Sequence, residues 1–479
     1  MIRTLTLLAT LTVLAACGGG DDGPALSPEA LQDPAKCMEC HPKHYDQWSG
    51  SMHAYASVDP VFVAMNKRGQ RETNNQLGTF CVQCHAPMAV ALGLTDGTNF
   101  DPATLPAVAN GITCYFCHDV AAVTGDHNNP LKLALDSTMH GALRNPVASP
   151  AHHSVFDPLM DSDTNNSEMC GSCHDIVSPA IPGHGPGGVT LERTFAEWKS
   201  TFFSDAEPTH HLSCGGCHMP ASSDVVADAP TLNVPLRPFG FHEHLWPAID
   251  QAVTPFPNAP TLATEIGGIL GPSVGVIGPA EPGTNIPTGG ICVDAGNTGE
   301  ISVRMDALSV AHTWPTGATQ DRRAWLEVIA YDASNAVVFS SGVVPDGMDP
   351  DAIAAADPSM FTMWDRPFKA DGSPAHFFWD VDHEDTTHHL KQPVTLNVND
   401  PAFDHSSTQV FIVGAKRAQI DHITTRVRIR PYNFALLNDL ISSGDLDAAV
   451  LAKVPTLDVE GTMETWTAAS VNVVSGCND

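Results

Sequence analysis

The pattern Cys-x-x-Cys-His occurs five times in the chain and places two thiols and one imidazole within five residues. Two thiols at this spacing can each form a thioether to one vinyl group of a haem, and the adjacent histidine can then bind the iron. A structural zinc site or a redox disulfide is the alternative, but neither requires a histidine directly after each second cysteine. The sequence therefore predicts five covalently bound c-type haems, attached through Cys37 and Cys40, Cys81 and Cys84, Cys114 and Cys117, Cys170 and Cys173, and Cys214 and Cys217.

The histidine that ends each motif is the predicted proximal iron ligand: His41, His85, His118, His174 and His218. A c-type haem has a second axial face, which another histidine can fill. The stretches Ser51-Met52-His53-Ala54 and Thr138-Met139-His140-Gly141 are similar, and each offers a histidine beside small residues. The predicted distal ligands are His53, His140, His153, His244 and His312, with His152, His211 and His242 as competitors; a solvent-exposed role is the alternative for each.

The first residues are typical of a secretion signal. Residues 1–3 precede an apolar stretch, residues 5–16, that is too short to span a bilayer. Residues 14–17 resemble a bacterial lipobox, which makes Cys17 the predicted lipid-modified first residue of the mature protein. An ordinary signal peptide with an incidental cysteine is the alternative. The sequence thus predicts a lipid-anchored protein of the bacterial cell envelope, on a periplasmic, outer-membrane or cell-surface face.

Of the 13 cysteines, only Cys292 and Cys477 have no role in haem attachment or lipid modification. In an oxidising compartment such a pair most simply forms a disulfide. The two residues enclose the C-terminal third of the chain, so a bridge would restrict its unfolded state.

Composition divides the chain into five segments. Residues 1–16 are the predicted signal peptide and residues 17–35 a flexible tether. Residues 36–246 carry all five motifs, and so little polypeptide per haem indicates a mainly α-helical and irregular multihaem cytochrome c domain with the porphyrins as its core. Residues 247–290 are rich in Pro and Gly and are predicted to be a linker. Residues 291–479 are predicted to form an all-β, sandwich-like domain.

The prediction for the last segment rests on short, alternating or β-branched stretches separated by turn residues. The expected strands are residues 301–310, 325–331, 336–343, 394–398, 410–416 and 426–430, with a small helix at residues 435–442.

Several stretches resemble the multihaem cytochrome c family typified by cytochrome c-554. They are CMECHPKHYDQWSGSMHAYA from residue 37, GITCYFCHDV from residue 111, MCGSCHDI from residue 169 and LSCGGCHMP from residue 212. The resemblance implies mostly bis-histidine, low-spin irons in close-stacked pairs, and electron transfer as the activity. The stretch from His312 to Val328 looks like the start of the β-domain of some envelope members. In such proteins the histidine of an H-x-x-P-T-G stretch can reach back to a haem.

The family also contains enzymes. Pentahaem nitrite reductases resemble this chain in haem number, but they use a lysine as the proximal ligand of the catalytic haem, and no Cys-x-x-Cys-Lys occurs here. Hydroxylamine-oxidising relatives have eight haems and a cross-linking tyrosine, whereas Tyr115 is interpreted as a haem-packing residue. An oxidoreductase acting on a small nitrogen or sulfur compound at one open haem is the alternative to electron relay. A docking role for the β-domain is compatible with both.

Charge narrows the class of partners. The formal net charge is −31 at pH 7, which excludes nucleic acid as a target. An acidic electron carrier is expected to dock on basic patches of other envelope redox proteins, namely cytochromes, quinol-linked donors or terminal reductases. Solubility in saline surroundings is an alternative reason for the acidity.

Two weaker patterns could bind metals. Residues 161–166, DSDTNN, begin like a calcium loop but lack its glycine and its terminal glutamate, so a capped turn is favoured. Residues 379–389 could hold a metal through Asp382, His383, Asp385 and His388, but their spacing is not diagnostic and a solvated loop is favoured.

Overall fold

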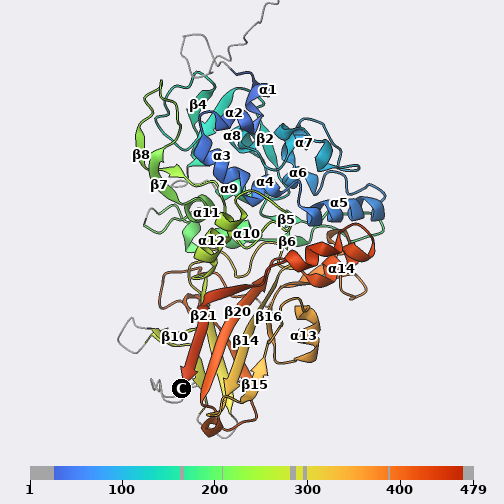
Figure 1. Cartoon of the computed structure of the whole chain (residues 1–479), viewed down its shortest axis with the longest axis vertical. Helices are drawn as coiled ribbons and strands as arrows, with labels where there is room; N and C mark the ends of the chain where they lie inside the picture. Colours follow the sequence, from blue (N-terminus) through green and yellow to red (C-terminus); the bar gives the residue numbers. More distant parts are fainter. Residues whose placement is uncertain are drawn as a thin grey trace, which may run out of the picture.

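The computed structural model describes residues 26–161, 167–207, 209–280, 287–294, 299–386 and 389–467. Its N-terminal part is made of short helices and hairpins, and its C-terminal part contains the long strands (Figure 1). Cys17, Cys477, His388 and the predicted signal peptide lie outside the described residues. The lipid anchor and the Cys292–Cys477 disulfide therefore stay predictions.

Short helices dominate the N-terminal part. Proline at the first helical position, which is pre-set for the helical φ, starts several of them, and an Asp, Ser or Thr side chain caps many. The helices are α1 (Pro28–Leu31), α2 (Pro34–Met38), α3 (Pro42–Ser49), α4 (Met52–Tyr55), α5 (Pro60–Glu72), α6 (Val82–His85), α7 (Pro87–Ala91), α8 (Cys114–His118), α9 (Ser167–Gly171), α10 (Thr194–Lys199) and α11 (Cys214–His218).

Four two-stranded sheets join these helices. Three are antiparallel and the pair β3–β4 is parallel. The strands are β1 (Val120–Val123) with β2 (Leu131–Leu133), β3 (Thr138–Gly141) with β4 (His153–Phe156), β5 (Ile176–Val177) with β6 (Thr190–Glu192), and β7 (Ala221–Val225) with β8 (Leu236–His242). Short 3₁₀ turns complete the chain: Pro102–Thr104, Ala107–Ala109, Pro158–Met160, Phe202–Ser204, Phe378–Asp380, Pro401–Phe403, Arg417–Gln419 and Ala448–Lys453.

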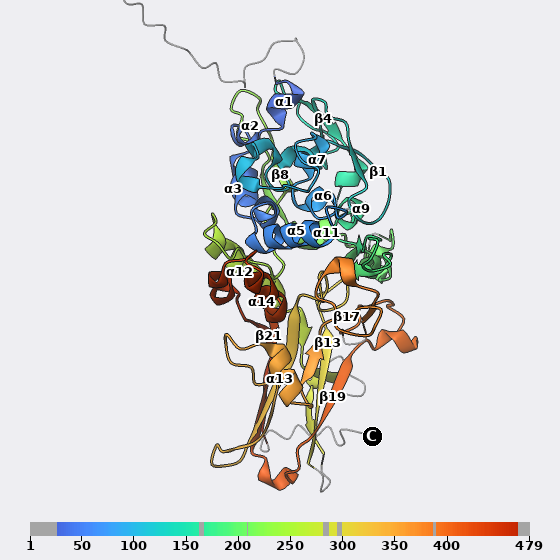
Figure 2. The same ribbon diagram turned by 90° about the vertical axis from the view of Figure 1, so that its right-hand side faces the viewer.

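Two antiparallel sheets form the C-terminal part. The first has the order β12–β13–β19, with β9 also paired to β13; the second has the order β15–β14–β20–β21, with β16 also paired to β14. In Figure 2, β21 and β19 lie on opposite sides of this part. The strands are β9 (Val274–Gly275), β12 (Ile291–Val293), β13 (Glu300–Ala307), β14 (Arg323–Tyr331), β15 (Val337–Ser341), β16 (Phe361–Met363), β19 (Ser407–Ile412), β20 (His422–Arg430) and β21 (Leu457–Thr467). Two separate pairs are β10 (Ile277–Ala280) with β11 (Pro287–Gly289), and β17 (Arg366–Phe368) with β18 (His383–Asp385).

Both sheets contribute to one hydrophobic core. Ile301 and Val303 of β13 are fully buried with Leu326 of β14 and Val427 of β20. The alternation of buried residues along β13 follows the two-residue period of a strand with one face on a core. The structure thus agrees with a helical and irregular part followed by a β part, while the sandwich arrangement stays a prediction.

Several sequence expectations need correction. Residues 247–290 contain helix α12 (Ala259–Leu270), whose Leu262, Ile266 and Leu270 are buried in the β core, so most of this segment is not a linker. Residues 26–35 of the predicted tether contain α1, and Leu31 is buried. No strand forms at residues 394–398, and β21 was not expected. The helix expected at residues 435–442 is confirmed as α14 (Phe434–Ser442).

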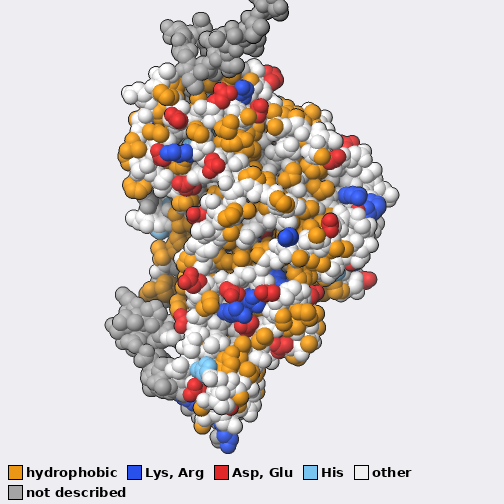
Figure 3. All heavy atoms as spheres, viewed as in Figure 1, with side chains coloured by type: hydrophobic (Ala, Val, Ile, Leu, Met, Phe, Trp, Pro, Cys, Tyr) orange, Lys and Arg blue, Asp and Glu red, His pale blue; other side chains and the backbone are white. Residues whose placement is uncertain are grey.

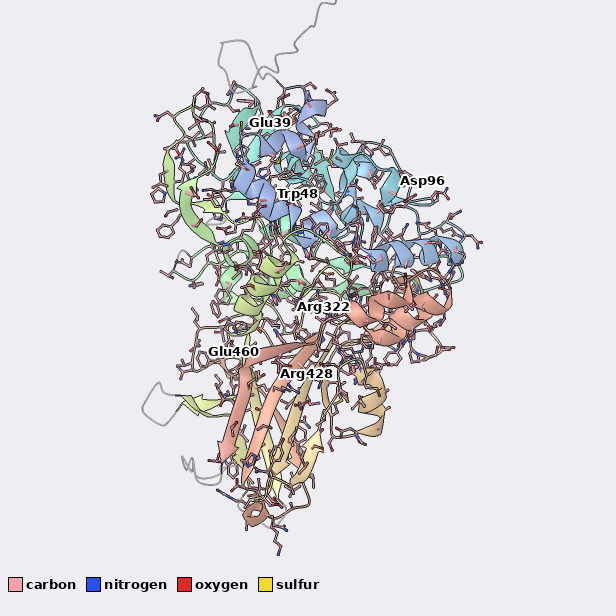
Figure 4. All side chains as sticks on the ribbon, in the orientation of Figure 1. Glu39, Trp48, Asp96, Arg322, Arg428 and Glu460 are labelled. Atoms are coloured by element: carbon pink, nitrogen blue, oxygen red, sulfur yellow. The ribbon has the colours of Figure 1, made fainter. Side chains whose placement is uncertain are left out.

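The two parts pack against each other. Val61, Ala64 and Met65 of α5 share a hydrophobic cluster with Leu437 and Leu440 of α14. Arg322 lies at the junction of the two parts, and its guanidinium donates to Asp250 at 3.0 Å (Figure 4). A further helix, α13 (Pro350–Ala356), packs beside the strands (Figure 1). Among the described residues, no helix is long and apolar enough to cross a membrane.

Candidate haem sites

Each Cys-x-x-Cys-His motif forms a single helical turn. In the first motif the N–H of His41 donates to the carbonyl of Cys37 at 2.7 Å, and in the fourth the N–H of His174 donates to Cys170 at 3.1 Å. Motifs two, three and five coincide with α6, α8 and α11. Side chains three and four residues apart share one face of a helix, so this turn presents both thiols and the imidazole on the same side.

The Nδ1 atom of every motif histidine has a hydrogen-bond partner. Four partners are backbone carbonyls, and the fifth is the carboxylate of Glu192. A hydrogen bond at Nδ1 fixes the ring orientation and leaves Nε2 as the free ligand atom. The pairs are His41 with Val226 at 2.7 Å, His85 with Ala56 at 3.1 Å, His118 with His140 at 2.6 Å, His174 with Glu192 at 3.2 Å and His218 with Pro247 at 2.9 Å.

Three motif histidines each have a second histidine ring at nearly the same distance, and His44 lies between two of these pairs, 5.8 Å from His41 and 4.6 Å from His244. Metal–nitrogen bonds of about 2 Å on both sides, plus about 1.1 Å from each Nε2 to its ring centroid, give a ring separation of roughly 6 Å across one ion. The observed separations fit one iron between each pair. The ring centroids are 6.4 Å apart for His41 and His152, 6.4 Å for His53 and His174, and 6.3 Å for His118 and His244.

A fourth histidine pair joins the two parts of the molecule. His312 follows β13 in the C-terminal part, and its charge is the strongest electrostatic influence of any other side chain on the pKa of His218. Glu197 of α10 holds this turn, because its Oε2 accepts from the N–H of Thr313 at 3.3 Å and from Thr316 Oγ1 at 2.6 Å. The C-terminal part therefore delivers a histidine to the fifth motif.

The surroundings of His85 are different. The ring of Phe62 stacks on the His85 imidazole with 4.1 Å between centroids and 3° between planes. Burial lowers the pKa of His85, and the charge of His174 in the fourth motif lowers it further. Among the described residues, the structure brings Phe62, and none of the predicted distal histidines, into ring contact with His85.

The other predicted distal residues divide into two groups. His153 is exposed, whereas the ring of its neighbour His152 lies 6.4 Å from that of His41. The carbonyl of His140 accepts from the motif histidine His118, and its own Nδ1 bonds Asp157 at 2.7 Å. His211 and His242 bond backbone carbonyls through Nδ1.

Burial keeps most of these imidazoles neutral, which is the form that binds a metal. Desolvation lowers the pKa of His53 and His244 to about 3 and that of His152 to about 4. It also lowers the pKa of His41, His85 and His118, and that of His218 to about 4. His174 is the exception: burial opposes protonation, but the hydrogen bond and charge of Glu192 raise its pKa to about 9.

Thiols of different motifs perturb one another's pKa values, and α2 contacts α8 while α9 contacts α11. The thiol pairs are Cys37 with Cys114, Cys84 with Cys173, and Cys170 with Cys214. Cys117 and Cys173 also influence each other electrostatically. The fourth motif therefore neighbours the second, third and fifth, and the first motif neighbours the third.

The two weaker metal patterns gain no support. His383 bonds Asp382 at 3.1 Å and stacks on Phe368, while Asp385 pairs with Arg366. Within the described ranges, no group of three or more His, Cys, Asp and Glu side chains could hold a metal ion. Most of residues 161–166 fall outside the description.

Sequence reasoning missed Glu192. It lies 18 residues after His174 and reaches it only because β5 pairs with β6, which brings Ile176 opposite Glu192. This contact depends on tertiary structure, and no local pattern in the sequence marks it.

Comparisons with known proteins agree with this geometry. Residues 36–119 match the family described as cytochrome c554 and c-prime. The structure is similar to the crystal structure of a penta-heme cytochrome c552 from Thermochromatium tepidum, with a TM-score of 0.58 and 18% sequence identity over 90% of this chain and 97% of that chain. At this identity the likeness concerns the fold. No curated protein shows a significant match. The family match and the shared fold together support a multihaem cytochrome c family for this chain.

Proposed function

We propose that this chain is an envelope cytochrome that binds five c-type haems and relays single electrons between redox partners. Each bound haem would supply a one-electron iron couple. The chain would attach the haems through the five Cys-x-x-Cys pairs and would bind each iron through the motif histidine, whose Nδ1 hydrogen bond holds the ring.

The histidine pairs carry this proposal. His152, His53 and His244 face the motif histidines His41, His174 and His118 at separations that fit one iron each. Two strong nitrogen ligands saturate an iron, which favours electron transfer over substrate binding. Their low pKa values keep the three distal imidazoles unprotonated at neutral pH.

The order of the motifs supports a branched relay. The thiol pairs link the first motif to the third and the fourth motif to the second and fifth, and electrostatic coupling links the third to the fourth. Haems attached to these motifs would be neighbours in the same pairs. The fourth haem, between His174 and His53, would then be the junction of the relay.

The C-terminal part has a ligand role in this proposal. His312 would be the distal ligand at the fifth motif, and Glu197 would hold its turn against the haem part. A domain that served only for docking would have no need to deliver a buried histidine to this position.

Localisation and partners follow from the sequence. Cys17 would anchor the mature chain to a membrane through lipid, with the Cys292–Cys477 disulfide stabilising the C-terminal part. On the face in Figure 3, acidic side chains are spread among exposed hydrophobic ones, while Lys and Arg form a few groups. With a net charge of −31, basic surfaces of other envelope redox proteins are the fitting partners.

A direct test uses the full-length holoprotein and a small basic cytochrome as the probe. After reduction with dithionite, the relay should pass electrons to the oxidised probe rapidly, and the rate should fall steeply as salt is raised. Slow transfer at every ionic strength would contradict the proposal. Turnover of nitrite, hydroxylamine or a sulfur oxyanion would instead favour an oxidoreductase, for which the environment of His85 is the place to look.

A further inference from the structure

The proximal histidine of the fourth motif has a different hydrogen-bond partner from the other four. The Nδ1 atom of His174 lies 3.2 Å from Oε1 of Glu192, whereas the other four rings bond neutral backbone carbonyls. The Glu192 side chain is 11% exposed and that of His174 is 54% exposed, and the two form an ion pair within the described chain. A formal negative charge is thus hydrogen-bonded to one of the five motif histidines.

The fold holds Glu192 in this position from both sides. β5 begins two residues after His174, and its antiparallel pairing with β6 sets Glu192 opposite Ile176. Asp175 accepts hydrogen bonds from the N–H groups of Phe195 and Ala196, which fixes the start of α10.

The residue after Glu192 ties the same strand to the C-terminal part. The guanidinium of Arg193 pairs with Asp365 at 2.8 Å and donates to Oε2 of Glu384 at 3.5 Å, and both acidic side chains are buried. Two long-range interactions therefore flank Glu192 and limit its movement.

A carboxylate in this place acts on the iron through the imidazole. The hydrogen bond makes the histidine a more basic ligand, and oxidised iron carries one more positive charge than reduced iron. The carboxylate itself is largely shielded from solvent, so its attraction to a positive charge is stronger than in water, and the oxidised state gains more than the reduced state. A backbone carbonyl carries only a partial charge and has a weaker effect.

We propose that Glu192 is a positioning residue that lowers the reduction potential of the haem held by His174 and His53, making this junction the low-potential centre of the relay. This inference rests on the proposed function, because it requires a haem at the fourth motif. The fourth motif neighbours the second, third and fifth motifs. By setting the reduction potential of the fourth haem, Glu192 would therefore control electron transfer among the haems of these three motifs.

The test is a potentiometric titration of the full-length holoprotein, in which each haem takes one electron from the reductant. Glu192→Gln keeps the shape and the acceptor oxygen but removes the charge. One of the potential components should move to a more positive value, with about a tenfold change in its reduction equilibrium, or about 59 mV for one electron. Glu168→Gln, which removes an exposed charge from α9 near the same motif, should leave that component in place.

Two further variants keep the test decisive. His53→Met should raise the potential of the same component, because a methionine ligand raises the potential of a haem iron. Glu192→Asp, which lengthens the hydrogen bond, should shift the reduction potential less than Glu192→Gln does. If the Glu192→Gln protein loses haem, the Glu192→Asp protein is used in its place. Unchanged potentials in both Glu192 variants with full haem content would overturn this inference alone. A wild-type protein without haem at the fourth motif would overturn the proposed function as well.

Discussion

The imidazole rings of His118 and His244 lie 6.3 Å apart, with 16° between their planes. The backbone carbonyl of His242 bonds Nδ1 of His244 at 2.7 Å and leaves Nε2 free of that bond. His244→Ala should therefore convert about one haem from low-spin to high-spin, as measured by electron paramagnetic resonance. His242→Ala is a matched control, because it retains the carbonyl that orients His244. A new high-spin signal in His242→Ala alone would reverse the assignment.

Two adjacent histidines offer an equally sharp comparison. His152 faces His41 at 6.4 Å, while His153 is exposed at the start of β4. We expect His152→Ala to produce a high-spin haem and His153→Ala to leave the spectrum of the holoprotein unchanged. If both variants gave the wild-type spectrum, neither residue would be a ligand.

The part of the site that could be predicted from the sequence is the part encoded locally. Cys37 to His41 specify one helical turn, and the same holds for the other motifs. The choice between His152 and His153 could not be made, because adjacent residues in extended chain point to opposite sides. Glu192 could not be predicted, since only strand pairing brings it to His174.

The fold shows the same division. The strand-like residues 301–310 and 325–331 predicted β13 and β14 well. One face of β13 lies on the core, and β14 is buried on both faces, with Leu326 in the main core and Trp325 in a second cluster. The Pro- and Gly-rich composition of residues 247–290 concealed α12, whose Leu262 and Ile266 have helical spacing and are buried only through contact with distant strands. Amino-acid composition indicates only the local preference for secondary structure, and tertiary packing can override that preference.

The role of the C-terminal part can be tested at His312. Because His312 is the proposed second ligand at the fifth motif, we expect that His312→Ala converts about one haem to high-spin, even though the residue lies outside the segment that carries the motifs. His376→Ala is the control, because His376 belongs to the same part of the chain but bonds Asp439 at 2.7 Å. Unchanged spin states in His312→Ala would leave the C-terminal part with a docking role only.

A buried carboxyl at the junction should make stability depend on pH. Burial and the charge of Asp365 raise the pKa of Glu384 from 4.5 to about 8. The folded chain therefore retains a proton that the unfolded chain loses, so the free energy of unfolding should fall as the pH rises from 4.5 towards 8. Glu384→Gln should flatten this decrease in urea unfolding experiments. The exposed Glu265→Gln should keep the wild-type slope, and an equal slope in Glu384→Gln would contradict this account.

The most direct test of the relay is a quantitative electron paramagnetic resonance spectrum of the fully oxidised holoprotein, calibrated by a haem count. Five haems per chain are expected, with low-spin signals from at least four irons. Three of these are at His41, His118 and His174, each with a second histidine ring 6.3 or 6.4 Å away, and the fourth is at His218, for which His312 is the proposed second ligand. The remaining haem, at His85, would show by its spin state whether its second axial face is filled. Fewer than four low-spin irons in a fully loaded protein would contradict the bis-histidine relay.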